Sequence, residues 1–136
     1  MTDNAPDNQK VRDRVLIIDD DAEVREVVID MLDSAGVKTM SAGSGEEGIT
    51  LFQSHQDEIE LVLLDLSMPG IGGKETFRRL RALKHDLKIV LSSGYGQDEV
   101  KNDLNFLGLT GFIQKPYRYA KLIGLIGKYL DGSSPG

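Results

Sequence analysis

The sequence contains no cysteine and no tryptophan, and only 6% of its residues are aromatic. Without cysteine the chain has no disulfide, no thiolate nucleophile and no thiolate metal ligand, a composition that suits the cytoplasm, where we expect the protein to be. No apolar stretch approaches the roughly 18 residues that a membrane-spanning helix needs. Residues 1–13 also lack the apolar core of a signal peptide, so we expect no contact with a membrane in this segment.

An excess of basic residues is also lacking. The chain carries 16 lysines and arginines against 22 acidic residues, which gives a formal net charge of −6. The densest basic cluster, Arg78, Arg79, Arg81 and Lys84, fits a solvated helix face better than a nucleic-acid footprint. We therefore expect protein partners and no direct binding to nucleic acid.

The length of 136 residues fits one domain. Residues 1–13 are polar and favour a disordered lead or linker, while residues 131–136 are rich in glycine and serine and favour a flexible tail. The single domain is therefore expected over residues 14–130.

Short apolar runs alternate with segments of helical periodicity within this domain, which is typical of an α/β protein. The runs predict five strands, at Arg14–Asp19, Val37–Ala42, Leu61–Asp65, Leu87–Ser92 and Gly111–Gln114. The periodic segments predict five helices: Ala22–Ala35, a second after the Ser44–Glu47 capping box, Lys74–Leu83, a fourth over about residues 98–107, and Tyr119–Leu130.

This alternation favours a doubly wound five-stranded parallel sheet, with helices on both faces and the strand order 2-1-3-4-5. Ligands of such sheets bind beyond the carboxyl ends of the strands, where the winding direction switches. In this order the switch lies between the first and third strands, which places a candidate site there.

Acidic residues end both of these strands. Asp19 and Asp20 follow the first strand and Asp65 ends the third, so three carboxylates are expected to converge. Like charges so close repel, and a divalent cation would remove that cost; Mg²⁺ prefers such hard oxygen ligands. The alternative is that Asp19, Asp20 and Asp21 cap the next helix and contribute no chemistry.

Two further residues are expected at the same edge of the sheet. Lys115 ends the fifth strand before Pro116 and could extend a compact positive charge over the carboxylates, although a solvated lysine in a turn is the simpler interpretation. Ser93 follows the fourth strand, where its hydroxyl could donate to a phosphoryl oxygen or merely solvate the turn.

Four segments carry a resemblance to a known family: VLIIDDD (Val15–Asp21), LVLLDLSMPG (Leu61–Gly70), IVLSSGYG (Ile89–Gly96) and GFIQKPY (Gly111–Tyr117). With their spacing, they resemble the receiver domain of response regulators in two-component signal transduction, over about residues 14–130. The resemblance implies a flavodoxin-like fold similar to that of the chemotaxis regulator. It also implies a signalling domain rather than an enzyme.

The resemblance assigns roles to individual residues. Asp65 matches the phosphoacceptor, Asp20 a direct Mg²⁺ ligand, and Asp19 a carboxylate that acts through water. The backbone carbonyl of Ser67 matches a further metal ligand, and Lys115 the lysine that contacts the phosphoryl group.

Two further positions match the residues that switch on phosphorylation in this family. Ser93 matches the switch hydroxyl, because Gly94 fits the small residue that follows it and the spacing to Lys115 suits it. Ser92 remains a rival for that role. Phe112 matches the aromatic switch residue of the fifth strand.

The implied partners are a histidine kinase or a histidine phosphotransfer domain as phosphoryl donor, and a downstream protein that the sequence does not name. The protein is expected as a monomer or weak dimer. It could be a stand-alone regulator or the receiver of a hybrid histidine kinase. Two other classes fit less well: a Mg²⁺-dependent phosphatase with an aspartate nucleophile, and an interaction module that is never phosphorylated.

Overall fold

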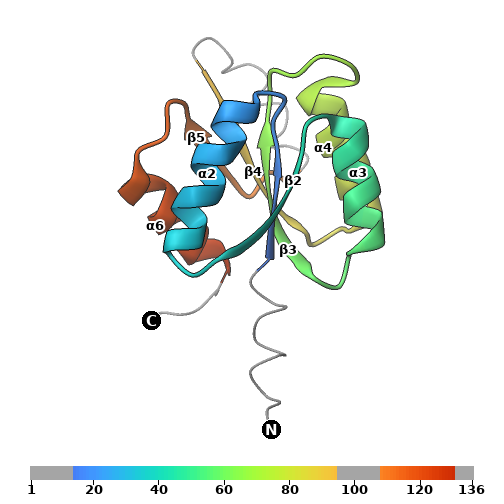
Figure 1. The fold of residues 1–136 in the computed structure, drawn as a ribbon. Coiled ribbons are helices and arrows are strands. Elements are labelled where there is room, and N and C mark those ends of the chain that lie inside the picture. Colours follow the sequence, from blue (N-terminus) through green and yellow to red (C-terminus); the bar gives the residue numbers. More distant parts are fainter. Residues whose placement is uncertain (1–13, 95–107, 131–136) are drawn as a thin grey trace, which may run out of the picture.

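The computed structural model describes residues 14–94 and 108–130 (Figure 1). Within these ranges five strands and four helices follow one another along the chain. In order they are β1 (Arg14–Ile18), α2 (Ala22–Ser34), β2 (Lys38–Ala42), α3 (Gly45–Ser54), β3 (Ile59–Asp65), α4 (Gly72–Leu83), β4 (Lys88–Ser93), β5 (Gly111–Gln114) and α6 (Tyr119–Leu130).

The strands form one sheet in the order β2-β1-β3-β4-β5, and every neighbouring pair is parallel. This confirms the predicted sheet and strand order. The central strands are buried on both faces because helices cover both, which explains why β3 is almost continuously apolar. The carboxyl ends of β1, β3, β4 and β5 consequently meet at one edge.

Helices cover the two faces in pairs: α2 and α6 lie on one side of the sheet, α3 and α4 on the other (Figure 1). Side chains alternate along each strand, so each face has its own core. Val15, Leu63 and Val90 belong to the core under α2 and α6, whereas Leu16, Leu64 and Leu91 belong to the core under α3 and α4. The same alternation decides on which face each residue at a strand end lies.

The helix boundaries follow from local capping. Asp21 caps α2 by accepting from the amides of Glu23 and Val24, and Gly36 follows the helix at a φ of 81°, a conformation that glycine adopts without strain. Ser44 caps α3 by accepting from the amide of Glu47. The return contact of the predicted box is shifted by one residue, because Glu47 accepts from the amide of Gly43.

Other predicted boundaries differ by one or two residues. Helix α4 begins at Gly72 instead of Lys74, and β4 extends to Ser93 instead of Ser92. The described residues therefore hold four helices against the five predicted; the helix expected over about residues 98–107 lies outside the described ranges. Residues 1–13 and 131–136, predicted as a linker and a tail, also lie outside them.

Candidate functional site

The polar residues predicted at the strand ends come together at the carboxyl edge of the sheet. Asp19 directly follows β1, Asp65 ends β3, and Lys115 directly follows β5. The Lys115 ammonium lies 2.9 Å from Oδ2 of Asp19 and 3.2 Å from Oδ1 of Asp65. One cation therefore bridges the two buried carboxylates, which rules out the simpler interpretation of Lys115 as a fully solvated turn residue.

Both oxygens of Asp19 are already engaged by the protein. Oδ2 contacts Lys115, and Oδ1 accepts a hydrogen bond of 2.9 Å from the amide of Asp21. Arg25, on helix α2, donates to the Asp19 carbonyl at 2.7 Å, which ties the end of β1 to the helix that follows it. A carboxylate held in this way is positioned rigidly, which fits a role through bound water better than a role as a direct metal ligand.

Asp65 is held less completely. Its Oδ1 receives both the Lys115 contact and a long hydrogen bond of 3.3 Å from the amide of Ser67. Burial and the neighbouring charge of Asp19 raise the pKa of Asp65, against the opposing effects of Lys115 and the Ser67 amide. The site therefore does not fully neutralise the ionised form of this carboxylate.

Lys115 experiences the opposite balance. Burial alone would lower the pKa of its ammonium, but the hydrogen bond to Asp19 and the charges of Asp65 and Asp19 outweigh burial and raise that pKa. The lysine therefore remains charged at neutral pH.

The site has the composition of a hard-cation site. One oxygen from each of Asp19, Asp20 and Asp65 lies within 4.8 Å of the others. Asp20 is exposed, and its carboxylate makes no hydrogen bond or ion pair within the described part of the chain. Three carboxylates against the one ammonium of Lys115 leave two negative charges, so a divalent cation such as Mg²⁺ fits both the charge and the oxygen donors.

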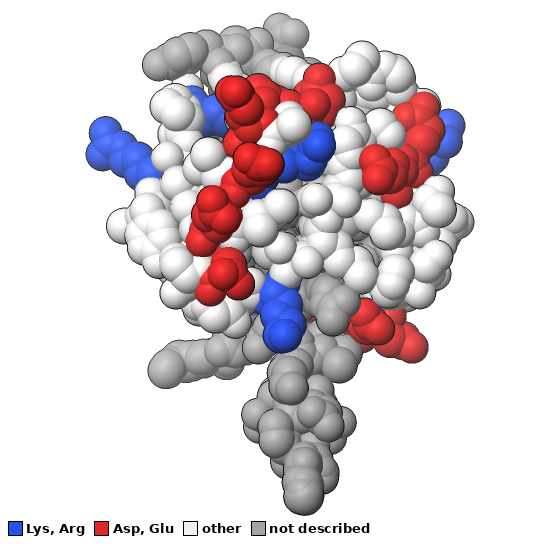
Figure 2. All heavy atoms as spheres, viewed as in Figure 1, with Lys and Arg blue, Asp and Glu red and all other residues white. Residues whose placement is uncertain are grey.

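Acidic side chains also continue along the surface from this edge. Figure 2 shows them running down helix α2, and the exposed acidic residues of that helix are Glu23, Glu26, Asp30 and Asp33. Asp20 and Asp21 precede the same helix and are exposed as well.

The two candidate switch serines, Ser92 and Ser93, lie on opposite faces of β4. Both are fully buried. Ser93 lies on the α3 and α4 side, and its hydroxyl donates to the carbonyl of Gly94 at 3.2 Å. Ser92 lies on the side of α2 and α6 and pairs in register with Asp65. The structure thus places Ser92 beside the acidic residue on the ladder, while the assignment of Ser93 as the switch hydroxyl stays a prediction.

The remaining two predicted residues are Phe112, on the strand next to Ser93, and Ser67, close to Asp65. Phe112 is partly buried, packs against the core under α3 and α4, and pairs in register with Leu91 on β4. It therefore shares its face of the sheet with Ser93. Ser67 follows β3 in the loop that leads to α4, and its amide faces Asp65.

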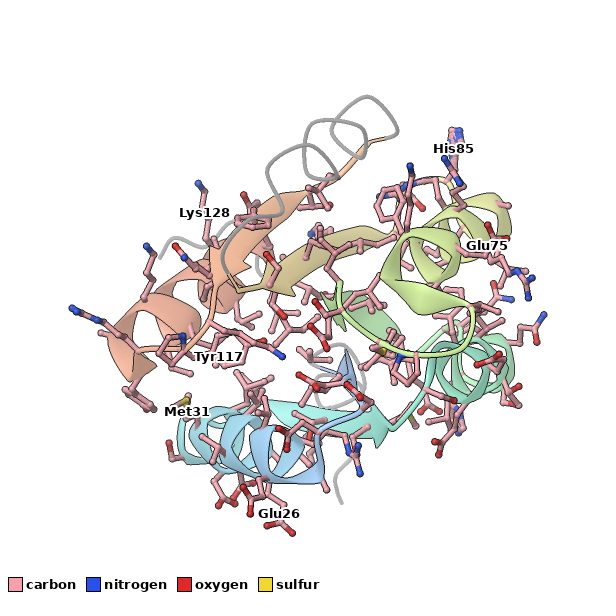
Figure 3. All side chains as sticks on the ribbon, turned by 90° about the horizontal axis from the view of Figure 1, so that it is seen from above. Glu26, Met31, Glu75, His85, Tyr117 and Lys128 are labelled. Atoms are coloured by element: carbon pink, nitrogen blue, oxygen red, sulfur yellow. The ribbon has the colours of Figure 1, made fainter. Side chains whose placement is uncertain are left out.

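Tyr117 was named in the sequence only as the last residue of the GFIQKPY segment, without a role of its own. It is partly buried, packs against the core under α2 and α6, and lies close to Ser92, Lys115, Asp19 and Asp65. In the view from above the sheet edge, it points inward from the chain leading to α6 (Figure 3). The signal that could have identified it is its place two residues after Lys115, behind a proline that turns the chain back toward the sheet.

Comparison of the sequence with known protein families identifies the family of this chain. The family described as "Response regulator receiver domain" matches residues 15–127. The chain belongs to this family. Receiver domains are signalling modules of two-component systems, and the flavodoxin-like order of strands described above is the fold of their solved members.

Individual relatives agree with that placement. Sporulation initiation phosphotransferase F of Bacillus subtilis is 23% identical over 120 residues, which cover 88% of this chain and 95% of the relative. A response regulator receiver protein of Pseudomonas putida has a solved structure with a TM-score of 0.78 and 34% identity, covering 85% of this chain and 95% of that one.

Other relatives are much longer proteins. Sensor kinase CckA of Brucella abortus is 29% identical over 86% of this chain, but the match covers only 12% of the kinase. Cell cycle transcriptional regulator CtrA of Caulobacter vibrioides is 31% identical over 83% of this chain and 48% of the regulator. Receiver domains of this kind therefore occur both nearly alone and as parts of larger proteins. No helix within residues 14–94 and 108–130 is long and apolar enough to cross a bilayer.

Proposed function

We propose that this receiver domain accepts a phosphoryl group onto Asp65 from a phosphohistidine of a histidine kinase or histidine phosphotransfer domain, and thereby controls a downstream protein. The observation that carries this proposal is the position of Asp65. Its carboxylate ends a buried strand, contacts Lys115 at 3.2 Å, and lies within 4.8 Å of oxygens from Asp19 and Asp20. Such an arrangement suits a nucleophilic carboxylate in a highly charged transition state.

The transfer uses the oxygen of Asp65 for which the described residues show no contact. Lys115 and the Ser67 amide both contact Oδ1, so Oδ2 is the oxygen that attacks phosphorus. The new P–O bond forms as the P–N bond to the donor histidine breaks, and the imidazole leaves with the electron pair and takes up a proton. Lys115 stabilises the negative charge on the equatorial phosphoryl oxygens, because its ammonium already lies at the acceptor.

The residues that would hold Mg²⁺ are Asp20 and Asp65 directly, Asp19 through water, and the backbone carbonyl of Ser67. The engagement of both Asp19 oxygens and the exposure of Asp20 support this division of roles. When bound, the ion neutralises charge on the phosphoryl oxygens and on the carboxylates.

The response to phosphorylation would involve Ser93 and Phe112. Both lie on the face of the sheet that packs under α3 and α4, on neighbouring strands. A phosphoryl group adds negative charge and acceptor oxygens, to which the Ser93 hydroxyl could turn from its contact with Gly94. Phe112 would then occupy the space that Ser93 vacates, and the altered surface near β5 would be read by the downstream protein.

The phosphoryl donor determines where in the cell we expect this protein to act. Histidine kinases draw the phosphoryl group from ATP, so we place the protein in the cytoplasm, as a monomer or weak dimer. The matches to a phosphotransferase and to a sensor kinase support both a stand-alone regulator and a receiver within a hybrid histidine kinase.

Replacement of Asp65 tests the proposal. The wild-type protein should gain the mass of one phosphoryl group with acetyl phosphate and Mg²⁺, as measured by intact mass spectrometry. Asp65→Asn should gain none. Asp21→Asn is the matched control, because asparagine keeps the helix cap while removing a nearby exposed carboxylate; it should be labelled as the wild type is. Labelling of the Asp65→Asn variant at the wild-type level would refute Asp65 as the acceptor.

A further inference from the structure

The Ser92 hydroxyl is buried without a partner. Its side chain is fully inaccessible, and its Oγ makes no hydrogen bond within the described part of the chain. Buried hydroxyls are normally hydrogen-bonded, so a serine in this state indicates either a strained position or a contact that forms in another state of the protein.

A candidate partner for this hydroxyl is the phenol of Tyr117, which packs against the core under α2 and α6, on the face of the sheet where Ser92 lies beside Ile113. The two groups are close enough for Ser92 to lower the pKa of the phenol, although burial has the larger effect and raises that pKa to about 12. Their oxygens do not reach hydrogen-bond geometry in the structure. A rotation of either side chain could bring the two hydroxyls together, and each hydroxyl can donate to the other.

Strand β4 holds the start of the turn that carries the lysine, and its residue Ser92 lies near the end of that turn. The amide of Lys115 donates to the carbonyl of Ser93 at 2.8 Å, which fixes the start of the turn to β4. Tyr117, two residues later, brings its hydroxyl back to the adjacent residue of the same strand. The Ser92 carbonyl also accepts from the amide of Leu66 at 2.9 Å, directly after Asp65. Ser92 is therefore linked to the acceptor strand through its backbone and faces the lysine turn with its side chain.

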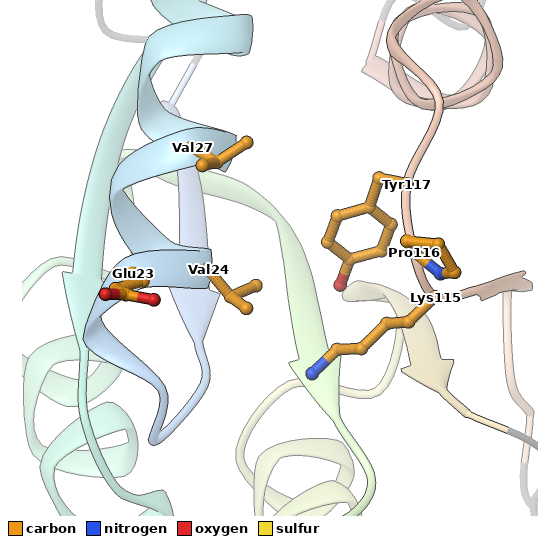
Figure 4. Close-up of a pocket in the computed structure, with 6 residues that line it drawn as sticks. All are labelled: Glu23, Val24, Val27, Lys115, Pro116 and Tyr117. Atoms are coloured by element: carbon orange, nitrogen blue, oxygen red, sulfur yellow. The ribbon is translucent and has the colours of Figure 1, made fainter.

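The Tyr117 ring packs against the core under α2 and α6 and also borders a pocket. A pocket of about 530 Å³ opens between α2 and the turn, and it is lined by Glu23, Val24, Val27, Lys115, Pro116 and Tyr117. Figure 4 shows Tyr117 and Lys115 both extending from the turn toward α2 across this space. Because the ring borders open space on one side, a polar contact at its hydroxyl would add to the packing that holds its position.

We propose that Ser92 and Tyr117 form a hydroxyl pair that holds the Lys115–Tyr117 turn against β4 and so sets the position of the Lys115 ammonium over Asp65. Tyr117 is thus a positioning residue that acts through Lys115 and does not touch the phosphoryl group itself. This inference rests on the proposed function for its consequence on labelling, but not for the contact.

The first test observes the lysine directly, without phosphoryl donor or metal. The ¹⁵N–¹H signal of the Lys115 ammonium is assigned by its loss in Lys115→Arg. It should shift in Tyr117→Phe and in Ser92→Ala, and the double variant should shift it no further than the larger single variant. Ser92→Thr, which keeps a hydroxyl, should leave the signal near the wild-type position. An unmoved signal in the two single variants, or shifts that add in the double variant, would overturn the proposal.

The second test measures the rate of labelling by acetyl phosphate in saturating Mg²⁺. Tyr117→Phe and Ser92→Ala should each lower the maximal rate about two- to tenfold, the range that one net hydrogen bond is worth. The donor concentration at half-maximal rate should not change, because binding of the donor is not affected. Equal rates in Tyr117→Phe and the wild type would contradict the positioning role.

The chain supplies a matched control in a second serine–tyrosine pair. Ser34 and Tyr119 share an exposed hydroxyl contact of 3.1 Å. Ser34→Ala and Tyr119→Phe remove the same atoms and should leave both the lysine signal and the labelling rate unchanged. If the wild-type protein is not labelled on Asp65, the proposed function fails, while the lysine signal still decides whether Ser92 and Tyr117 position the turn.

Discussion

The two ends of the sheet hold their buried cations in contrasting ways. At the carboxyl end, Lys115 contacts the carboxylates of Asp19 and Asp65, whose negative charge it does not balance. At the amino end, Arg81 of α4 donates to the carbonyls of Lys84, His85, Leu87 and Gly108, and Lys88 donates to the carbonyl of Tyr129. Cations at the amino end therefore donate their hydrogen bonds to neutral backbone oxygens.

The contrast separates function from stability within one small domain. Contacts between Arg81 and carbonyls join α4, the start of β4 and the segment before β5, and they lie at the end of the sheet away from the acidic residues. Ionic contacts at Lys115 can be redistributed when a cation or a phosphoryl group arrives, because charges dominate that end. Sites with unbalanced charge commonly reduce stability in return for activity.

Arg81→Ala should have the largest effect on stability. It removes the donor to several carbonyls and the packing of the guanidinium over the Phe77 ring at 5.5 Å. The contacts with Lys84 and Leu87 are partly buried, whereas water can replace those with His85 and Gly108. An unsatisfied carbonyl costs about 1–3 kcal/mol, so with the lost packing we expect the free energy of unfolding in urea to fall by about 2–4 kcal/mol in total. Arg79→Ala, which loses only an exposed contact with Glu75, should change it by less than about 0.5 kcal/mol.

Phosphoryl labelling of Asp65 in Arg81→Ala tests whether the amino end of the sheet serves stability alone. Below its melting temperature, Arg81→Ala should still be labelled by acetyl phosphate to the wild-type extent, because its contacts lie away from the acidic residues. A loss of labelling in folded Arg81→Ala would show that the amino end takes part in the chemistry, and the contrast would fail.

Tyr117 should make the carboxyl end sensitive to alkaline pH. Burial raises the pKa of its phenol to about 12 from an ordinary value of 10.0, so on raising the pH the unfolded state loses the proton first. Stability is therefore retained below about pH 10 and lost as the pH rises toward 12, by about 2 kcal/mol at the upper end.

The measurement compares the free energy of unfolding in urea at about pH 9, before the expected loss of stability, and at about pH 11.5, within it. Tyr117→Phe should lose less stability between them than the wild type, because it has no phenol to ionise there. Tyr129→Phe, at the amino end, is the matched control and should follow the wild type. The same alkaline loss in Tyr117→Phe would show that other groups cause it.

Asp65→Asn should have the smallest effect on stability, and of opposite sign. Burial and Asp19 raise the pKa of Asp65, so its ionised form at neutral pH lowers stability. The neutral amide should raise the free energy of unfolding without metal by about 0.5–2 kcal/mol, the range of other changes that relieve a functional site. Asp21→Asn should not show this gain, and a lower stability in Asp65→Asn would mean that Lys115 already balances the site.

Added Mg²⁺ should reverse the order of the two proteins. A cation that binds only the folded state stabilises it by mass action, and the wild type offers three carboxylates where Asp65→Asn offers two. The melting temperature of the wild type should therefore rise with Mg²⁺ more than that of the variant. Equal rises in both would contradict Asp65 as a metal ligand.

Much of the architecture could be predicted from local signals. Apolar runs identified all five strands to within two residues, and Asp21, Gly36 and Ser44 marked helix ends because capping depends on residues only a few positions apart. The start of α4 was predicted two residues late, since glycines of the preceding segment favour a loop when no tertiary contact is known. The carboxylates at strand ends followed from the same reasoning once the strand order was assumed.

The contacts between distant segments were decided by the tertiary structure alone. The sequence by itself determined that Asp19, Asp65 and Lys115 end their strands, since strand ends depend on nearby residues. Only the tertiary structure decided that Lys115 bridges both carboxylates, that Ser92 rather than Ser93 lies on the face of Asp65, and that Arg81 reaches Gly108. The physical reason is that side chains alternate with a period of two, so a shift of one residue in register, which no local pattern fixes, moves a side chain to the other face.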